Sequence, residues 1–325
     1  MPIEYNIEEH RNYILKLQEV EKRLPARNIK ILPIIFTLQD GAKLFSFIYR
    51  PNNLKNPPYP TVLHIRGTGY NASASYHDYL TSSHLAEESG CQLIRIEHRL
   101  APEYTCPIGF QDVYTSYQLI IKYAEQLQID KDKIAICGFS SGGNFSALTT
   151  IQAVKDKLPL ALQILISPVT DLSLSLKKFA SFEAKDSFPK KLAHWFIELY
   201  LHKNKHDPQN PTISPYWSND LTNLPPTYIL FGEFDRFRSH SEAYANKLAN
   251  FGVWTHKSLF KNENHMMYWN NIRVLETIAT QLKMVFNLTS LPKAISPLFF
   301  QKKYKKSSKI NPYRIDFRPS RPIKL

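Results

Sequence analysis

Short strand-like and helix-like segments alternate along most of this 325-residue chain, and this alternation limits the fold more than any other feature. Runs of β-branched and aromatic residues predict strands, whereas apolar residues spaced three and four apart predict helices. The predicted strands lie near 30–37, 43–50, 61–66, 92–97, 133–137, 160–166, 226–231 and 254–260. The predicted helices lie near 7–23, 76–89, 111–128, 142–155, 239–251 and 268–286. Strands that alternate with helices predict an α/β fold, in which helices cover both faces of a mostly parallel sheet.

Composition excludes several other classes of protein. Hydrophobic residues make up 43% and charged residues 21% of the chain, which is typical of a globular protein and not of a disordered one. No apolar run approaches the roughly 18 residues of a membrane span. Cys91, Cys106 and Cys137 are too few for a disulfide framework and lack the clustered spacing of a zinc site.

A Gly-x-Ser-x-Gly segment follows the predicted strand 133–137 and precedes a predicted helix. In that setting the serine lies on a tight strand-to-helix turn, and glycines two residues to either side leave room for it. Only Ser140 has glycines at both of these positions, Gly138 and Gly142. We therefore predict that Ser140 is a nucleophile, and that the backbone N–H of Ser141 can donate to an oxyanion.

A serine hydroxyl needs a base to act as a nucleophile near neutral pH, and the base needs a group that orients it. In the fold that carries this turn, the acid and then the histidine follow the serine along the chain. Asp235 follows the predicted strand 226–231, and His265 follows the predicted strand 254–260. Both residues should lie at the same sheet edge as Ser140, so the sequence predicts a Ser140–His265–Asp235 triad.

Four segments resemble motifs of the bacterial hormone-sensitive-lipase family of α/β-hydrolases, and the similarity extends over about residues 30–287. The segments are HRLAPE (98–103), GFSSGGN (138–144), SPVTDL (167–172) and LPP with GEFDRFR (224–226 and 232–238), which resemble YRLAPE, GDSAGGN, SPxxDL and LPP…DPLRDE. The resemblance implies an α/β-hydrolase fold. It also assigns Ser140, Asp235 and His265 to the catalytic triad.

The resemblance further identifies an oxyanion loop, although this loop departs from the family pattern. Residues 66–70, RGTGY, stand where the family has HGGGF. Carried over position by position, the backbone N–H groups of Thr68, Gly69 and Ser141 would form the oxyanion hole. Threonine does not easily take a positive φ, so its presence would either weaken catalysis or tune substrate choice. Two roles are open for Arg66 beside this loop. Its side chain either binds an acidic group of the substrate or pairs with a carboxylate at the sheet edge.

The resemblance also divides the chain into parts. Residues 31–176 and 216–288 would form the catalytic core. Residues 1–30 and the insertion 177–215, which is rich in aromatic residues and has no predicted strand, would form a helical cap over the active site. Residues 289–325 would form a basic C-terminal tail.

The net charge of +13 is concentrated in that tail, because residues 291–325 carry ten Lys or Arg residues against one acid, Asp316. Such a segment, with aromatic residues between the basic ones, is compatible with a peripheral membrane contact, a partner contact or a simple solvated tail. It contains no base-reading module, so we expect no nucleic-acid function. The N-terminus lacks the pattern of a signal peptide, which predicts a cytoplasmic location, with leaderless secretion left open. A homodimer is also left open.

The leading hypothesis from the sequence is a serine carboxylesterase for short- to medium-chain esters that works through an acyl-enzyme. Its partner would be a small-molecule ester, and it would use no metal and no cofactor. Two alternatives remain. One is a small-molecule-binding protein on a hydrolase scaffold with little or no catalysis. The other is an arylformamidase or a deacetylase with the same triad.

Overall fold

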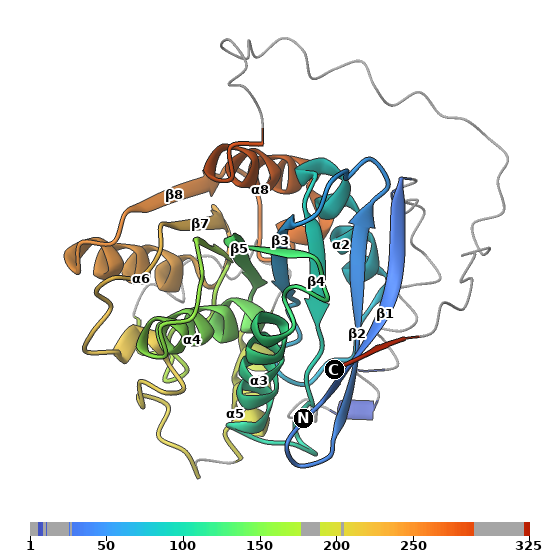
Figure 1. Ribbon diagram of the computed structural model, residues 1–325. Coiled ribbons are helices and arrows are strands. Elements are labelled where there is room, and N and C mark those ends of the chain that lie inside the picture. Colours follow the sequence, from blue (N-terminus) through green and yellow to red (C-terminus); the bar gives the residue numbers. More distant parts are fainter. Residues whose placement is uncertain are drawn as a thin grey trace, which may run out of the picture.

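The computed structural model describes residues 6–8, 11, 26, 28–176, 189–202, 205–288 and 322–325, and in these residues nine strands form one sheet (Figure 1). The strands are β1 (Ile29–Thr37), β2 (Lys43–Pro51), β3 (Tyr59–Ile65), β4 (Gln92–Ile96), β5 (Ile129–Phe139), β6 (Leu162–Ile166), β7 (Thr227–Gly232), β8 (Thr255–Phe260) and β9 (Ile323–Lys324). The strand order is β8-β7-β6-β5-β3-β4-β2-β1-β9. In this order, the six strands from β8 to β4 all pair in parallel with their neighbours. The next strand, β2, pairs antiparallel with both β4 and β1. The predicted α/β fold is confirmed.

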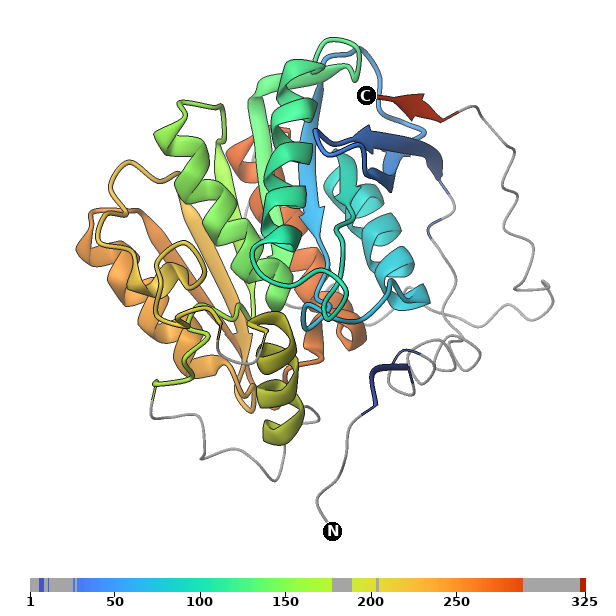
Figure 2. The same cartoon turned by 90° about the horizontal axis from the view of Figure 1, so that it is seen from below.

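Helices cover both faces of the sheet (Figure 2). They are α2 (Tyr76–Ser89), α3 (Ile108–Lys122), α4 (Ser141–Lys155), α5 (Lys190–Tyr200), α6 (Arg238–Asn250), α7 (Met267–Asn270), α8 (Ile272–Val285) and the short 3₁₀ turn η2 (Pro215–Trp217). The helices α2 and α8 pack together on one face, and α3 and α4 pack on the other. This arrangement leaves the carboxyl ends of the parallel strands as the edge where loops gather.

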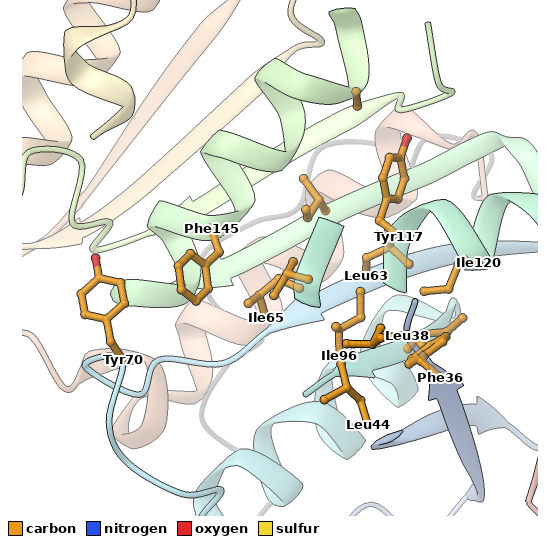
Figure 3. Packing of buried hydrophobic residues seen from close by; sticks show 14 of the residues in the cluster. Phe36, Leu38, Leu44, Leu63, Ile65, Tyr70, Ile96, Tyr117, Ile120 and Phe145 are labelled. Carbon is orange, nitrogen blue, oxygen red and sulfur yellow. The ribbon is translucent and has the colours of Figure 1, made fainter. Parts of the chain in front are cut away.

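Alternating side chains of the central strands divide the core into two layers. Val62 of β3 and Leu93 of β4 belong to a cluster that includes residues of α2 and α8. The next residues, Leu63 and Ile94, belong to a second cluster that includes residues of α3. Figure 3 shows Leu63 of this second cluster beside the side chains of α3. These strands are buried on both faces, which explains why apolar residues occupy adjacent positions in their sequences and not only alternate ones.

Local capping explains where two of the helices begin. Ser75 and Asp78 form a reciprocal capping box at the start of α2, and the helix spans the residues predicted for it, 76–89. The predicted helix 268–286 is instead divided into α7 and α8. Asn271 is the N-cap of α8, and its side chain accepts a hydrogen bond from the Arg273 amide. An asparagine with an extended backbone ends one helix and begins the next.

The described part of the predicted insertion contains α5 and no strand. Tyr200, at the end of α5, stacks on Tyr70 with the ring centroids 4.2 Å apart. Its carbonyl also accepts a hydrogen bond from the Cys106 amide over 2.8 Å. The first part of the insertion, residues 177–188, lies outside the described residues, as does most of the predicted N-terminal helix 7–23.

The end of the chain adds a strand that the sequence does not predict. Ile323 and Lys324 form β9, which pairs in parallel with Ile34 and Ile35 of β1. Leu325 continues this pairing, because its N–H donates to the Ile35 carbonyl over 2.9 Å. Residues 289–321 of the predicted basic tail lie outside the described residues. Among the helices that the structure describes, none has the length and apolar character needed to cross a membrane.

Candidate active site

The turn between β5 and α4 holds Ser140 in a strained backbone conformation. Its φ is 55° and its ψ is −117°, a combination that side-chain-bearing residues rarely adopt. A Cβ atom on Gly138 would lie 2.2 Å from the carbonyl oxygen of Gly142. A Cβ atom on Gly142 would lie 2.2 Å from the carbonyl oxygen of Ile65 in β3. Both glycines are therefore required by close backbone contacts, and the turn has the geometry expected of a nucleophile elbow.

The structure brings Ser140, His265 and Asp235 together from three different connections. The Oγ of Ser140 lies 3.0 Å from Nε2 of His265, and Nδ1 of His265 lies 2.9 Å from Oδ1 of Asp235. Ser140 follows β5, Asp235 follows β7 and His265 follows β8. These strands are parallel, so their carboxyl ends place the three side chains at one edge of the sheet. All three residues are buried.

Asp235 is fully buried, and its surroundings favour the ionised carboxylate. Burial alone would raise the pKa of Asp235. The charge interaction and hydrogen bond with His265, together with the hydrogen bond from the Phe237 amide, outweigh that effect and hold the pKa below its usual value. The carboxylate of Asp235 accepts a hydrogen bond from the Nδ1–H of His265. This bond keeps the proton on Nδ1 and leaves Nε2 free to act as the base.

Two aromatic rings contact the imidazole of His265. The ring centroid of Phe139 lies 5.1 Å from that of His265 with the planes tilted by 30°, and Phe237 lies at the same distance with its ring nearly edge-on. Phe139 stands where the elbow of the resembling family has aspartate. A Cβ atom on Gly67 would meet this ring at 2.5 Å, so Phe139 packs against both the histidine and the loop after β3.

The loop after β3 carries two of the three predicted oxyanion donors, Thr68 and Gly69, and Thr68 contacts the third, Ser141, which begins α4. The Thr68 N–H donates to the Ser141 Oγ over 2.9 Å, and the Tyr70 N–H donates to the Thr68 Oγ1 over 2.9 Å. Positive φ falls on Gly69 (54°) and Tyr70 (70°), not on Thr68. Thr68 therefore does not have to take a positive φ, and the adjacent glycine adopts the left-handed conformation.

Arg66 pairs with a carboxylate at the sheet edge, which is the second of its two interpretations. Its Nε lies 2.8 Å from Oε2 of Glu97, and its Nη1 donates to the Ala72 carbonyl over 3.0 Å. Arg95 contacts the other oxygen of Glu97 at 2.9 Å. Burial tends to raise the pKa of Glu97, but the two arginines lower it to about 2. Arg66 thus ties the oxyanion loop to the strand edge.

Sequence reasoning missed two polar residues that hold the same loop. The buried side chain of Asn71 donates to the carbonyls of Gly69 and, over 3.1 Å, of Phe196 in α5. Arg11 donates to the Asn71 carbonyl over 3.0 Å and forms a two-pronged ion pair with Glu103. Apart from the bond between Asn71 and Gly69, these contacts join segments that are 60 to 125 residues apart, so no local sequence pattern predicts them. The polar Asn71 beside the glycines was the one available signal.

Within the part of the chain that the structure describes, no three His, Cys, Asp or Glu side chains gather as they would to hold a metal ion. The reactive groups near the elbow are those of Ser140, His265 and Asp235. This arrangement can remove a proton from the serine hydroxyl, and backbone amides nearby can stabilise negative charge that develops on a bound carbonyl.

The sheet order and the elbow define an α/β-hydrolase. A sequence profile described as the alpha/beta hydrolase fold matches residues 62–269, and the chain belongs to that family. The fold class predicted from the four motifs is thereby confirmed.

Several relatives carry names that describe ester hydrolysis. An arylesterase of Saccharolobus solfataricus is 32% identical over 214 residues, which are 66% of this chain and 68% of the relative. An ethyl acetate hydrolase of Pseudomonas putida is 28% identical over 240 residues, which are 72% of this chain and 74% of the relative. A solved structure of a hyperthermophilic esterase from the archaeon Pyrobaculum calidifontis matches with a TM-score of 0.79 at 25% identity, over 86% of this chain and 94% of the other. These relatives agree with the resemblance to hormone-sensitive-lipase-type esterases.

Proposed function

We propose that the protein is a serine carboxylesterase that hydrolyses short- to medium-chain esters through an acyl-enzyme. One observation carries the proposal: a hydrogen-bonded path from the Ser140 Oγ through the His265 ring to the Asp235 carboxylate, with distances of 3.0 and 2.9 Å. The esterase names of the relatives support the substrate class.

In the proposed reaction, the Ser140 Oγ attacks the ester carbonyl while His265 Nε2 takes its proton. Asp235 fixes the imidazole tautomer and stabilises the imidazolium that forms. The tetrahedral intermediate collapses when His265 gives the proton to the leaving alcohol. A water molecule, activated by the same histidine, then hydrolyses the acyl-enzyme. Backbone N–H groups of Thr68, Gly69 and Ser141 would stabilise the oxyanion in both steps.

The segments 1–30 and 177–215 would act as a cap over this site. The support comes from α5, whose residue Phe196 leaves no room for a Cβ atom on Gly69: such an atom would lie 2.2 Å from the ring. An aromatic side chain that contacts the oxyanion loop is in position to bound the space for the acyl group. We propose that replacement of Phe196 by alanine shifts the preference toward longer acyl chains.

A fluorophosphonate probe tests the nucleophile directly. Intact-protein mass spectrometry should find one adduct on the wild type, none on Ser140→Ala, and one on the control Ser258→Ala, which removes a hydroxyl from the edge strand β8. Unchanged labelling of folded Ser140→Ala would contradict the assignment of the nucleophile. No adduct on folded wild type would instead favour the alternative of a binding protein without catalysis.

A panel of p-nitrophenyl esters, an arylformamide and acetylated sugars would separate an esterase from an arylformamidase or a deacetylase.

The proposals for the tail need separate experiments. If the tail contacts a membrane surface, the full chain should bind vesicles that contain phosphatidylserine and not vesicles of phosphatidylcholine alone. Replacing its lysines and arginines before residue 322 with glutamine should abolish this binding while β9 is kept.

The cytoplasmic location and the homodimer stay predictions. Light scattering coupled to size-exclusion chromatography measures the oligomeric state.

A further inference from the structure

The Thr68 amide, one of the three proposed oxyanion donors, already has a hydrogen-bond acceptor in this structure. Its N–H donates to the Ser141 Oγ over 2.9 Å. We propose that the Ser141 side chain is a positioning residue that competes with the oxyanion for the Thr68 amide, so that this donor joins catalysis only after the Ser141 hydroxyl turns away. The inference rests on the proposed esterase function and deepens it.

The other polar groups of Thr68 are fixed by hydrogen bonds within the loop. The Thr68 carbonyl accepts from the amides of Asn71 (3.1 Å) and Ala72 (2.9 Å), and the Thr68 hydroxyl accepts from the Tyr70 amide (2.9 Å). These bonds hold the threonine from both sides. The contact with Ser141 differs, because its acceptor is a hydroxyl on a side chain that can change rotamer without moving the backbone.

Ser141 is placed so that it can make this change. It is fully buried and is the first residue of α4, so its own backbone N–H has no acceptor within the helix and can face an oxyanion. Its Oγ also lies 3.3 Å from the Thr68 Oγ1, which offers the hydroxyl a second partner. The Oγ of Ser141 can therefore release the Thr68 amide and still be hydrogen-bonded.

The strengths of the two hydrogen bonds predict when the Thr68 amide changes its acceptor from Ser141 to the oxyanion. A net hydrogen bond between neutral groups corresponds to a factor of about two to ten in an equilibrium. A donor to the oxyanion of an acyl-transfer intermediate is worth about 10²–10³ in turnover. The Thr68 amide should thus stay with Ser141 in the resting enzyme and move to the oxyanion in the transition state. An interaction that must be broken only in the transition state lowers kcat and leaves KM nearly unchanged.

The decisive variant is Ser141→Ala, which removes the competing acceptor and leaves the backbone N–H of residue 141 in place. We expect kcat for p-nitrophenyl butyrate to rise about two- to tenfold, with KM nearly unchanged. The rate of fluorophosphonate labelling at Ser140 should rise by the same factor. The affinity for a trifluoromethyl ketone, which forms a tetrahedral adduct, should also increase by that factor. Ser141→Cys, with a weaker acceptor, should lie between the wild type and the alanine variant.

Two controls keep the result interpretable. Ser146→Ala removes a buried hydroxyl from the same helix and should leave kcat unchanged. Ser141→Gly also lacks the acceptor and provides a second test if the alanine variant does not fold. A kcat for Ser141→Ala equal to or below that of the wild type, at unchanged fold, would overturn the proposal while the esterase assignment stands. Wild-type protein with neither turnover nor a probe adduct would overturn the esterase function and this inference with it.

Discussion

The side-chain amide of Asn71 donates to the carbonyl oxygen of Phe196 over 3.1 Å, and this bond ties α5 to the loop that carries the proposed oxyanion donors. The same amide also donates to the Gly69 carbonyl. One buried side chain therefore joins the insertion to the oxyanion loop by two hydrogen bonds, in addition to the ring contacts of Phe196 and Tyr200.

We predict that Asn71→Leu lowers kcat/KM about tenfold, because the peptide of Gly69 loses the bond that fixes its orientation. Each lost hydrogen bond should also reduce stability by about 1 kcal/mol, so the melting temperature should fall by several degrees. Steady-state kinetics and thermal unfolding measure the two effects. Asn219→Ala, at an exposed position, is the matched control. If Asn71→Leu keeps full activity, the loop does not depend on this bond.

Asp235→Asn should lower kcat about 10⁴-fold with little change in KM, because an amide can stabilise the wrong tautomer of His265. The low pKa of Asp235 means that the carboxylate is already ionised at pH 5, so titration of Asp235 should not limit activity between pH 5 and 8. Stopped-flow acylation and circular dichroism check rate and fold together. The exposed Asp132→Asn should behave as the wild type, and an equal loss in that variant would show that the effect is not specific to the triad.

The ion pairs of Glu97 predict a pH dependence of stability. Its pKa is about 2 in the folded protein, whereas an unfolded chain has a glutamate pKa of about 4.3. The unfolded state therefore takes up the proton first as the pH falls. The stabilisation is fully present above about pH 4.3 and is lost as the pH falls toward 2.

Glu97→Gln tests this sign, because it leaves Arg66 and Arg95 without their common carboxylate. We expect it to lower the free energy of unfolding by about 3 kcal/mol at pH 7. The difference from the wild type should shrink between pH 4.3 and 2, as measured by urea unfolding. The exposed Glu88→Gln serves as the control. A difference that stays constant over this pH range would show that the charge of Glu97 is not responsible.

Arg11 should be important for activity although it lies far from Ser140 in the sequence. Its guanidinium donates to the carbonyls of Asn71 and Ala101 and to both oxygens of Glu103. Arg11→Lys keeps the charge but cannot make this planar, branched set of bonds, so it should lower kcat/KM nearly as much as Arg11→Ala, by about threefold or more. Arg273→Ala on the exposed side of α8 controls for loss of a positive charge. Full activity of Arg11→Lys would show that only the positive charge at this position matters and that the branched set of hydrogen bonds does not.

The strand β9 should protect the edge of β1. Leu325→Pro removes the N–H that bonds to Ile35, and we expect the melting temperature to fall by about 2–4 °C. An uncovered edge strand pairs readily with another chain, so the variant should also associate at high concentration in size-exclusion chromatography. Lys324→Ala, which keeps the backbone bonds, should remain like the wild type. Identical melting temperatures for the two variants would contradict a stabilising role of β9.

The sequence was sufficient for the parts of the fold that local periodicity encodes. The buried strands and most helices were predicted to within a few residues, because apolar period and turn chemistry act over short distances. The meeting of Ser140, Asp235 and His265 also followed, since the ends of parallel strands share one edge.

The remaining features arise from long-range contacts. A strand of two residues, β9, has no detectable period, and its pairing with β1 joins positions almost 300 residues apart. The pairing of Ser141 with Thr68 could not be predicted because it depends on a side-chain rotamer across 73 residues of sequence. The threonine in the oxyanion loop does not have to take a positive φ, because the loop takes positive φ one residue later, at Gly69.

The strand order has a consequence for how activity would return during refolding. Ser140 follows β5, while Asp235 and His265 follow β7 and β8, and β6 lies between β5 and β7 in the sheet. The three side chains can meet only after four parallel strands have paired in register, and such long-range pairing is slow compared with helix formation. Catalytic activity should therefore recover after the far-ultraviolet signal of the helices, and would report the completion of this half of the sheet.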